Sequence, residues 1–167
     1  SVTVYQRTPQ WARPVAGFGD PAARLVVVGL APAAQGGNRT GRVFTGDRSG
    51  DWLFAALHRA GYANQPTSTR RDDGLQLIGA YVAAVVRCAP PANKPTPEEQ
   101  ATCRPYLVRE LQLLPELQVI LPLGALGWDA ALRSLAALGH ETPRPKTRFG
   151  HGAATRTLPY TLLGRSP

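Results

Sequence analysis

Short apolar runs alternate with amphipathic segments along this chain of 167 residues. Residues 25–28 read Leu-Val-Val-Val, and residues 81–86, 119–121 and 160–163 are also mostly apolar. Runs of this length and composition are typical of parallel strands that are buried on both faces of a sheet. The pattern therefore predicts four buried strands.

The segments between the strands carry helix signals. Ser49 stands before a stripe of apolar residues and Gly61 stands after it, which predicts a helix over residues 49–60 with Ser49 as its cap. Residues 126–138 carry a further apolar stripe and predict another helix.

The strongest local signal lies near the middle of the chain. Thr96 is followed three residues later by Glu99, the spacing of a capping box, and Pro97 occupies the first helical position. These residues predict a helix to about residue 114, with a kink at Pro105. Residues 1–21 contain several Pro and Gly residues and predict irregular structure.

Strands that alternate with helices predict an α/β fold with three α/β/α layers around a central four-stranded parallel sheet. The chain shows no internal repeat or linker, so we expect residues 1–167 to form a single domain. In such sheets ligands bind beyond the carboxyl ends of the strands. The loops that follow the four strands should therefore share one rim.

Composition narrows the class of protein. No apolar run approaches the roughly 20 residues of a membrane span, and no leader sequence is recognisable, so we expect a cytoplasmic protein. The formal charge of +8 favours a polyanionic partner, although a GC-rich coding bias would also explain the abundance of Arg. Two cysteines are too few for a disulfide framework, which leaves inert core residues, a single disulfide or half of a four-ligand metal site as alternatives.

The loop over residues 30–47 carries the least ordinary chemistry. It is rich in glycine, which lets backbone N–H groups approach a ligand, and it contains several arginines, an amide side chain at Asn38 and a flat ring at Phe44. Loops of this length usually have a function, and a mobile surface loop is the alternative. The segment matches neither nucleotide-binding glycine motif, which disfavours an ATP or NAD site.

Four blocks of this sequence closely resemble the iron–sulfur uracil-DNA glycosylases of the family-five, double-strand-active branch. The blocks are residues 29–32 (Gly-Leu-Ala-Pro), residues 38–47 (Asn-Arg-Thr-Gly-Arg-Val-Phe-Thr-Gly-Asp), residues 87–97 around Cys88, and residues 148–152 (Arg-Phe-Gly-His-Gly). The resemblance implies a DNA repair enzyme that hydrolyses the N-glycosidic bond of uracil and other deaminated bases in double-stranded DNA. It implies a monomer whose partner is DNA with a damaged base.

The resemblance assigns catalytic and base-binding roles to individual residues. Asn38 matches the position that holds a water in related enzymes, with an Asx turn as the alternative. Asp47 belongs to the same motif and is a second catalytic candidate, although a carboxylate is also favourable at the start of the following helix. Phe44 matches the ring that stacks on the flipped base, with core packing as the alternative.

Other base-contacting positions depart from the patterns of related branches. Ala31 stands where other branches carry an acidic or amide residue, and Gln35 stands where His is expected. Ala84 replaces an Asn that reads the pyrimidine edge in related glycosylases, which predicts loose selectivity that extends to hypoxanthine. The residues expected to contact DNA are Arg39, Arg42, Arg48, Asn93 and Lys94.

The resemblance also implies a [4Fe-4S] cluster with Cys88 and Cys103 as two of its four ligands. The family has its first ligand pair in an N-terminal segment and a catalytic loop after the fourth strand. We therefore expect the 167 residues to be truncated at both ends. An alternative function is a non-catalytic DNA-binding or damage-sensing module with the same fold.

Overall fold

A computed structural model describes residues 13–144, 146–157 and 159–164 of the chain. The elements in chain order are β1 (Phe18–Gly19), β2 (Leu25–Gly29), α1 (Gly37–Thr40), α2 (Arg48–Arg59), β3 (Ala80–Ala84), the 3-10 turn η2 (Pro91–Asn93), α3 (Pro97–Gln112), β4 (Val119–Pro122), α4 (Ala125–Ala137), β5 (Ala154–Thr157) and β6 (Tyr160–Leu163). The fold is α/β, as the sequence pattern predicts.

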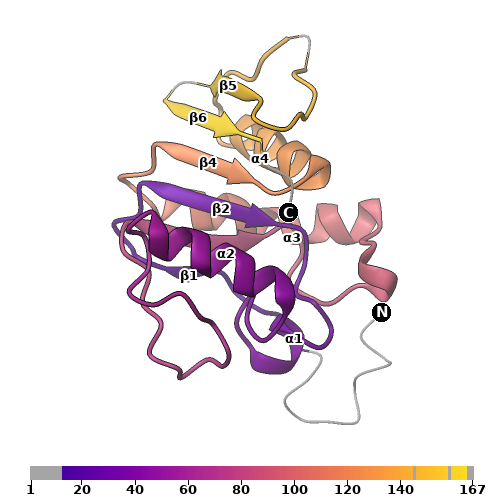
Figure 1. The fold of residues 1–167 in the computed structure, drawn as a ribbon. Helices are drawn as coiled ribbons and strands as arrows, with labels where there is room; N and C mark the ends of the chain where they lie inside the picture. Colours follow the sequence, from indigo (N-terminus) through magenta and orange to yellow (C-terminus); the bar gives the residue numbers. More distant parts are fainter. Residues whose placement is uncertain (1–12, 145, 158, 165–167) are drawn as a thin grey trace.

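The strands form one sheet in the order β1-β3-β2-β4-β6-β5 (Figure 1). The four predicted strands are its parallel centre, with β2 paired to both β3 and β4, and β4 paired to β6. The prediction of a four-stranded sheet is wrong in number, because β1 and β5 add an antiparallel strand at each edge. The strand β1 has two residues and lies in a segment predicted to be irregular, and its pairing depends on β3 rather than on local pattern.

Alternate residues of β2 face the two helical layers. Val26 and Val28 pack in a core with α3 and α4, whereas Val27 packs in a second core with Phe54 and Leu57 of α2. All three valines are fully buried, as expected for a central parallel strand. The helix α2 therefore covers one face of the sheet, and α3 and α4 cover the other (Figure 1).

The helix ends follow local capping rules with one correction. The capping box is present, since Thr96 and Glu99 each accept a hydrogen bond from the other's backbone N–H, at 3.1 and 2.9 Å. The helix α3 continues through Pro105 and ends at Gln112. The predicted cap of α2 at Ser49 is wrong, because the side chain of Asp47 accepts the N–H of Gly50 at 2.9 Å and the helix begins at Arg48.

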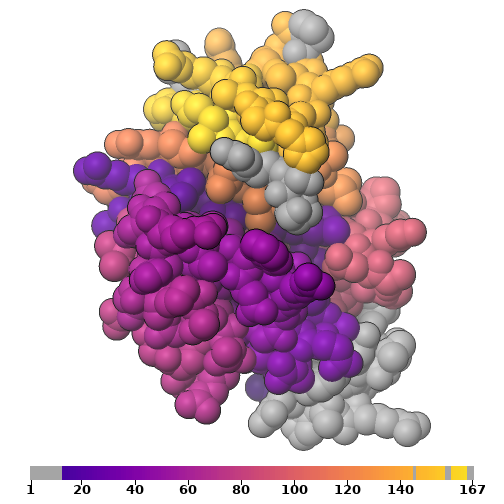
Figure 2. Space-filling view, in the orientation of Figure 1, coloured from indigo at the N-terminus to yellow at the C-terminus, as the bar shows by residue number. Residues whose placement is uncertain are grey.

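In the space-filling view the first half of the chain, indigo to magenta, forms one end of the molecule, and the hairpin of β5 and β6, in yellow, lies at the other end (Figure 2). None of the described helices combines the length and apolar character that crossing a bilayer would require.

Candidate functional site

A cavity of about 360 Å³ opens at the carboxyl edge of the sheet. Three loops that follow strands β2, β3 and β4 supply its walls, as predicted for this rim. Its lining residues are Gly29, Leu30, Ala31, Ala33, Phe44, Asp47, Ser49, Asn93, Leu123, Gly124, Ala125 and Leu126. The loop predicted to follow β6 lies outside the described residues, apart from Gly164.

The ring of Phe44 forms one wall and lies directly against the end of β2. A Cβ atom on Gly29 would lie 2.4 Å from both Cε2 and Cζ of the ring, so the ring occupies the space that any side chain at position 29 would need. The carbonyl oxygen of Phe44 packs against Gly50 in the same way, with 1.8 Å to a hypothetical Cβ. Two glycines therefore make room for this one residue.

The backbone of Phe44 is left-handed, with φ of +53°. This conformation is a genuine outlier for a bulky residue and costs about 1–3 kcal/mol, so the surrounding structure must hold it in place. The ring is half-buried and remains open to the cavity. It therefore presents a flat apolar face to any ligand in the cavity.

The polar groups of the cavity are few. The carboxylate of Asp47 lies in the lining, with Oδ1 bound to the N–H of Gly50 and Oδ2 close to Gly36. Asn93 enters from the loop after β3 with φ of +56°, a conformation that Asn tolerates. The helix α4 begins at this wall with no side-chain cap, so its first N–H groups favour negative charge nearby.

The structure distributes the predicted catalytic and base-binding residues unevenly. Ala31, Phe44 and Asp47 line the cavity, whereas Asn38 is 2 % exposed, does not line it and donates from Nδ2 to the carbonyl of Ala34 at 3.4 Å. Gln35 is exposed, and its carbonyl accepts a hydrogen bond from Arg39 Nε. Ala84 is buried at the end of β3, beside Gly29.

The predicted DNA-contacting cations also separate into two groups. Arg39, Arg48 and Lys94 are exposed. The structure does not support a DNA contact for Arg42, whose side chain is 7 % exposed and forms an ion pair with Asp73 at 2.9 Å. Nothing in the sequence signalled this pairing, because the two residues are 31 positions apart and Asp73 lies in a polar loop.

The loop after β4 was predicted to lie on this rim, but the sequence singled out none of residues 123–126, which form one wall of the cavity. Leu123 and Gly124 directly follow β4 at the carboxyl end of the strand, which is why they reach the cavity. Leu126 is 41 % exposed at this wall. The cavity is therefore more aliphatic than the motifs alone implied.

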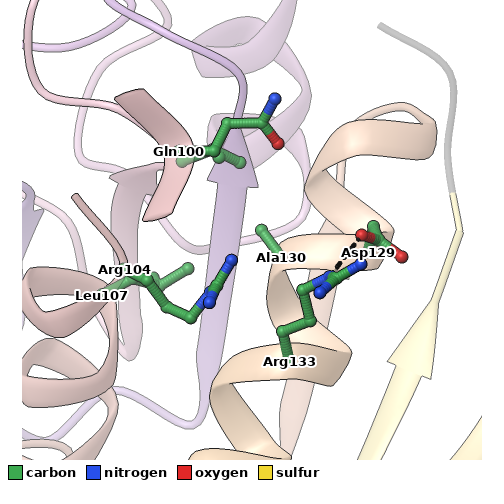
Figure 3. A pocket seen from close by; sticks show the side chains of 7 residues that line it. Gln100, Arg104, Leu107, Asp129, Ala130 and Arg133 are labelled. Carbon is green, nitrogen blue, oxygen red and sulfur yellow. Dashed lines mark hydrogen bonds and ion pairs between the residues drawn. The ribbon is translucent and has the colours of Figure 1, made fainter. Parts of the chain in front are cut away.

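A second cleft lies between α3 and α4, where Gln100 and Arg104 face Asp129 and Arg133 (Figure 3). Arg133 pairs with Asp129 at 2.8 Å, and Lys146 pairs with the same carboxylate. The cleft volume is about 10 Å³, which is room for about one water molecule. It is therefore too small to hold an organic ligand.

The two cysteines are free and half-buried, Cys88 after β3 and Cys103 in α3. Burial raises the pKa of the Cys88 thiol, and the neighbouring Cys103 and Glu99 raise it further. Within residues 13–144, 146–157 and 159–164, no group of three His, Cys, Asp or Glu side chains could hold a metal ion. The pair alone is half of the thiolate set that a four-iron cluster requires.

The fold and the cavity together define a three-layer α/β protein with a ring-walled pocket at the carboxyl edge of its sheet. Residues 16–161 match the family model described as the uracil DNA glycosylase superfamily. The chain belongs to this superfamily.

Relatives of known class cover most of this chain. It is 53% identical over 148 residues to a type-5 uracil-DNA glycosylase of Mycobacterium tuberculosis, which covers 88% of the chain and 54% of the relative. It is 50% identical over 149 residues to the type-5 enzyme of Thermus thermophilus, covering 89% and 65%. A type-4 enzyme of Thermotoga maritima is 38% identical over 112 residues, or 66% of the chain and 50% of the relative. The chain thus spans between half and two thirds of the length of these relatives.

Proposed function

We propose that this chain carries the base-binding part of a DNA repair glycosylase, a hydrolase that cleaves the N-glycosidic bond of uracil and other deaminated bases in double-stranded DNA. One observation carries the proposal: a flat ring, Phe44, and a carboxylate, Asp47, line the same cavity at the carboxyl edge of the sheet. Relatives named type-5 uracil-DNA glycosylase support the choice of substrate.

The cavity suits a base that has left the DNA stack. Flipping a nucleotide out of the base stack costs a few kcal/mol of stacking and pairing free energy. Stacking of the flipped base on the Phe44 ring offsets part of that cost. Negative charge develops on the base as the bond to the sugar breaks. The amide of Asn93 and the uncapped N–H groups at the start of α4 are the groups available to stabilise that charge.

Asp47 is the proposed water-positioning residue. Its Oδ1 is held by the N–H of Gly50, which fixes the carboxylate in the cavity wall. From there the charge of Asp47 orients a water toward the sugar carbon and stabilises the cationic sugar. Asn38, the first choice from sequence, is buried behind the lining, so the geometry favours Asp47 for this role.

The aliphatic lining supports broad base selectivity. The lining contacts a base mainly through the side chains of Leu30, Leu123 and Leu126, which respond to the shape and apolar area of the base. It offers one amide side chain, Asn93, to form hydrogen bonds with a base edge. A pocket of this kind discriminates weakly between ligands that differ in polar groups. We therefore propose that hypoxanthine is excised at a rate comparable to uracil, each opposite its pairing partner.

Cys88 and Cys103 are proposed as two ligands of a [4Fe-4S] cluster. They fit as a pair, since neither is in a disulfide and the two lie near each other, but four thiolates are required and these 167 residues contain two cysteines. A bound cluster would link the loop after β3 to helix α3. The chemistry proposed for Phe44, Asp47 and Asn93 does not pass through it.

The test is base release by the full-length protein from a duplex with one uracil, detected as strand cleavage at the abasic site after alkali. Wild-type release that is lost in both Asp47→Asn and Phe44→Ala supports the proposal. Asn38→Ala tests the rival catalytic assignment. Tight binding to the duplex without release of any base would favour the non-catalytic, damage-sensing alternative.

A further inference from the structure

The strained residue Phe44 lies between two residues that belong to one buried hydrogen-bond network. The guanidinium of Arg42 donates from Nε to Thr45 Oγ1 at 3.0 Å and from Nη2 to Ser68 Oγ at 2.8 Å. Thr45 Oγ1 and Ser68 Oγ also form a hydrogen bond at 2.7 Å. Arg42, two residues before Phe44, and Thr45, directly after it, are thus bonded to each other and to a distant loop.

Asp73 anchors this network. Both of its carboxylate oxygens accept from Arg42 Nη2 at 2.9 Å, and its side chain is 8 % exposed. Oδ2 accepts the N–H of Thr69 at 2.8 Å and Oδ1 accepts the N–H of Leu75 at 3.0 Å, so the carboxylate also organises its own loop. A paired buried charge of this kind is rigid, because every alternative arrangement leaves an uncompensated ion.

No member of the network lines the cavity, whereas Phe44, which lies between Arg42 and Thr45 in the chain, does. Gly46, two residues after Phe44, donates its N–H to the carbonyl of Ser68 at 3.0 Å, which adds a backbone link to the same loop. The strained backbone of Phe44 persists only if contacts on both sides of the residue hold it. Without them, φ of Phe44 would return to a negative value and the ring would move away from Gly29.

We propose that Asp73, acting through Arg42 and Thr45, is a positioning residue that holds the Phe44 ring in place as the stacking wall of the cavity. This inference rests on the proposed function for its meaning in catalysis. Asp73 then acts on base recognition without lining the cavity, and the polar contacts of Arg42 support the ring.

Two pairs of variants of the full-length protein isolate the effect. Asp73→Asn removes the charge, and its control Asp72→Asn removes an exposed carboxylate of a surface ion pair in the same loop. Thr45→Val keeps the shape of a fully buried side chain and removes its hydroxyl, whereas Thr45→Ser keeps the hydroxyl. If Asp73→Asn does not fold, the comparison of Thr45→Val with Thr45→Ser still tests the inference.

The first measurement reports ring position without reference to activity. In protein with fluorinated phenylalanine, the Phe44 resonance, identified by its loss in Phe44→Leu, should be single and sharp in wild type, Asp72→Asn and Thr45→Ser. It should broaden or split in Asp73→Asn and Thr45→Val. An unchanged Phe44 resonance in the folded Asp73→Asn and Thr45→Val variants would overturn the inference.

The second measurement is duplex affinity with and without a base to stack. The uracil nucleotide carries a 2′-fluorine, which blocks hydrolysis of its glycosidic bond, so the base stays in place during the binding measurement. Asp73→Asn and Thr45→Val should weaken binding to this duplex roughly tenfold more than binding to the same duplex with an abasic site. In a Phe44→Ala background they should weaken neither further. An equal loss on both duplexes, or additive losses in that background, would contradict positioning. Failure of wild type to release uracil would reject the proposed function while leaving the resonance test valid.

Discussion

The ring of Phe44 fills the position that a side chain at Gly29 would occupy, with 2.4 Å from the hypothetical Cβ to the ring atoms Cε2 and Cζ. Gly29 is the last residue of β2, so the rigid end of a central strand sets where the ring stands. The glycine in this motif is therefore explained by the close approach of a ring, and its backbone does not adopt positive φ.

Gly29→Ala should displace the Phe44 ring, since the strand cannot move and the ring can. We expect a loss of about 1–3 kcal/mol in the free energy of unfolding from overpacking and a fall in base release of roughly 100-fold from misplacement of the ring. Gly150→Ala is the control, because its Cβ would meet Ala153 at an ordinary 3.6 Å. Single-turnover rates and urea unfolding check both, and a normal rate in Gly29→Ala would show that the ring position does not matter.

Asp47→Asn distinguishes the capping role of Asp47 from a catalytic one. Asn caps helices about as well as Asp, so the variant should keep its hydrogen bond to Gly50 and lose little stability. Base release should nevertheless fall roughly 100-fold or more if the carboxylate orients water. Asp47→Ala should in addition lose about 1 kcal/mol of stability. A wild-type rate in Asp47→Asn would leave Asp47 with the capping role alone.

Acid should destabilise the protein through Asp73. Burial tends to raise the pKa of Asp73, but hydrogen bonds from the Leu75 N–H and from Arg42 lower it to about 2, below its ordinary value of 3.8. A lowered folded-state pKa contributes stability that is present above about pH 4 and is lost as the pH falls toward 2. The loss should be about 2 kcal/mol, measured by urea unfolding between pH 5 and 2, and Asp73→Asn should flatten this part of the curve.

Cluster ligation predicts a colour that depends on the two thiols. The purified full-length protein should absorb near 400 nm, as iron–sulfur proteins do, and either Cys88→Ser or Cys103→Ser should abolish the band. Thr102→Ser, an exposed neighbour of Cys103 on α3, should leave it unchanged. Retention of the full band in both cysteine variants would exclude Cys88 and Cys103 as ligands.

Arg48 and Arg59 lie at opposite ends of α2, and only Arg48 lies at the cavity end. If Arg48 contacts a DNA phosphate, Arg48→Gln should reduce the slope of log affinity against log salt by about 1. Arg59→Gln should leave the slope unchanged, although it removes the same charge from the same helix. Equal changes in both variants, seen in salt titrations of duplex binding, would indicate a diffuse effect of net charge instead of a contact.

The sequence by itself determined those features that depend on neighbouring residues. The apolar runs identified the four parallel strands, the Thr96–Glu99 spacing placed the start of α3, and the order of strands and helices placed the ligand cavity at the carboxyl edge of the sheet. Hydrophobic periodicity and helix capping depend on residues that are close together in the sequence, so the sequence is enough to predict them.

Tertiary structure alone decided which side chain each polar residue meets. Arg42 and Phe44 belong to the same motif, yet Arg42 pairs with the distant Asp73 and does not line the cavity. Similarly, Asn38 is buried outside the cavity lining, whereas Asp47 is part of the lining. The edge strands β1 and β5 likewise exist because a partner strand was available. These choices depend on which distant segments the fold brings together, and a charged side chain excluded from water takes the partner that the fold places beside it.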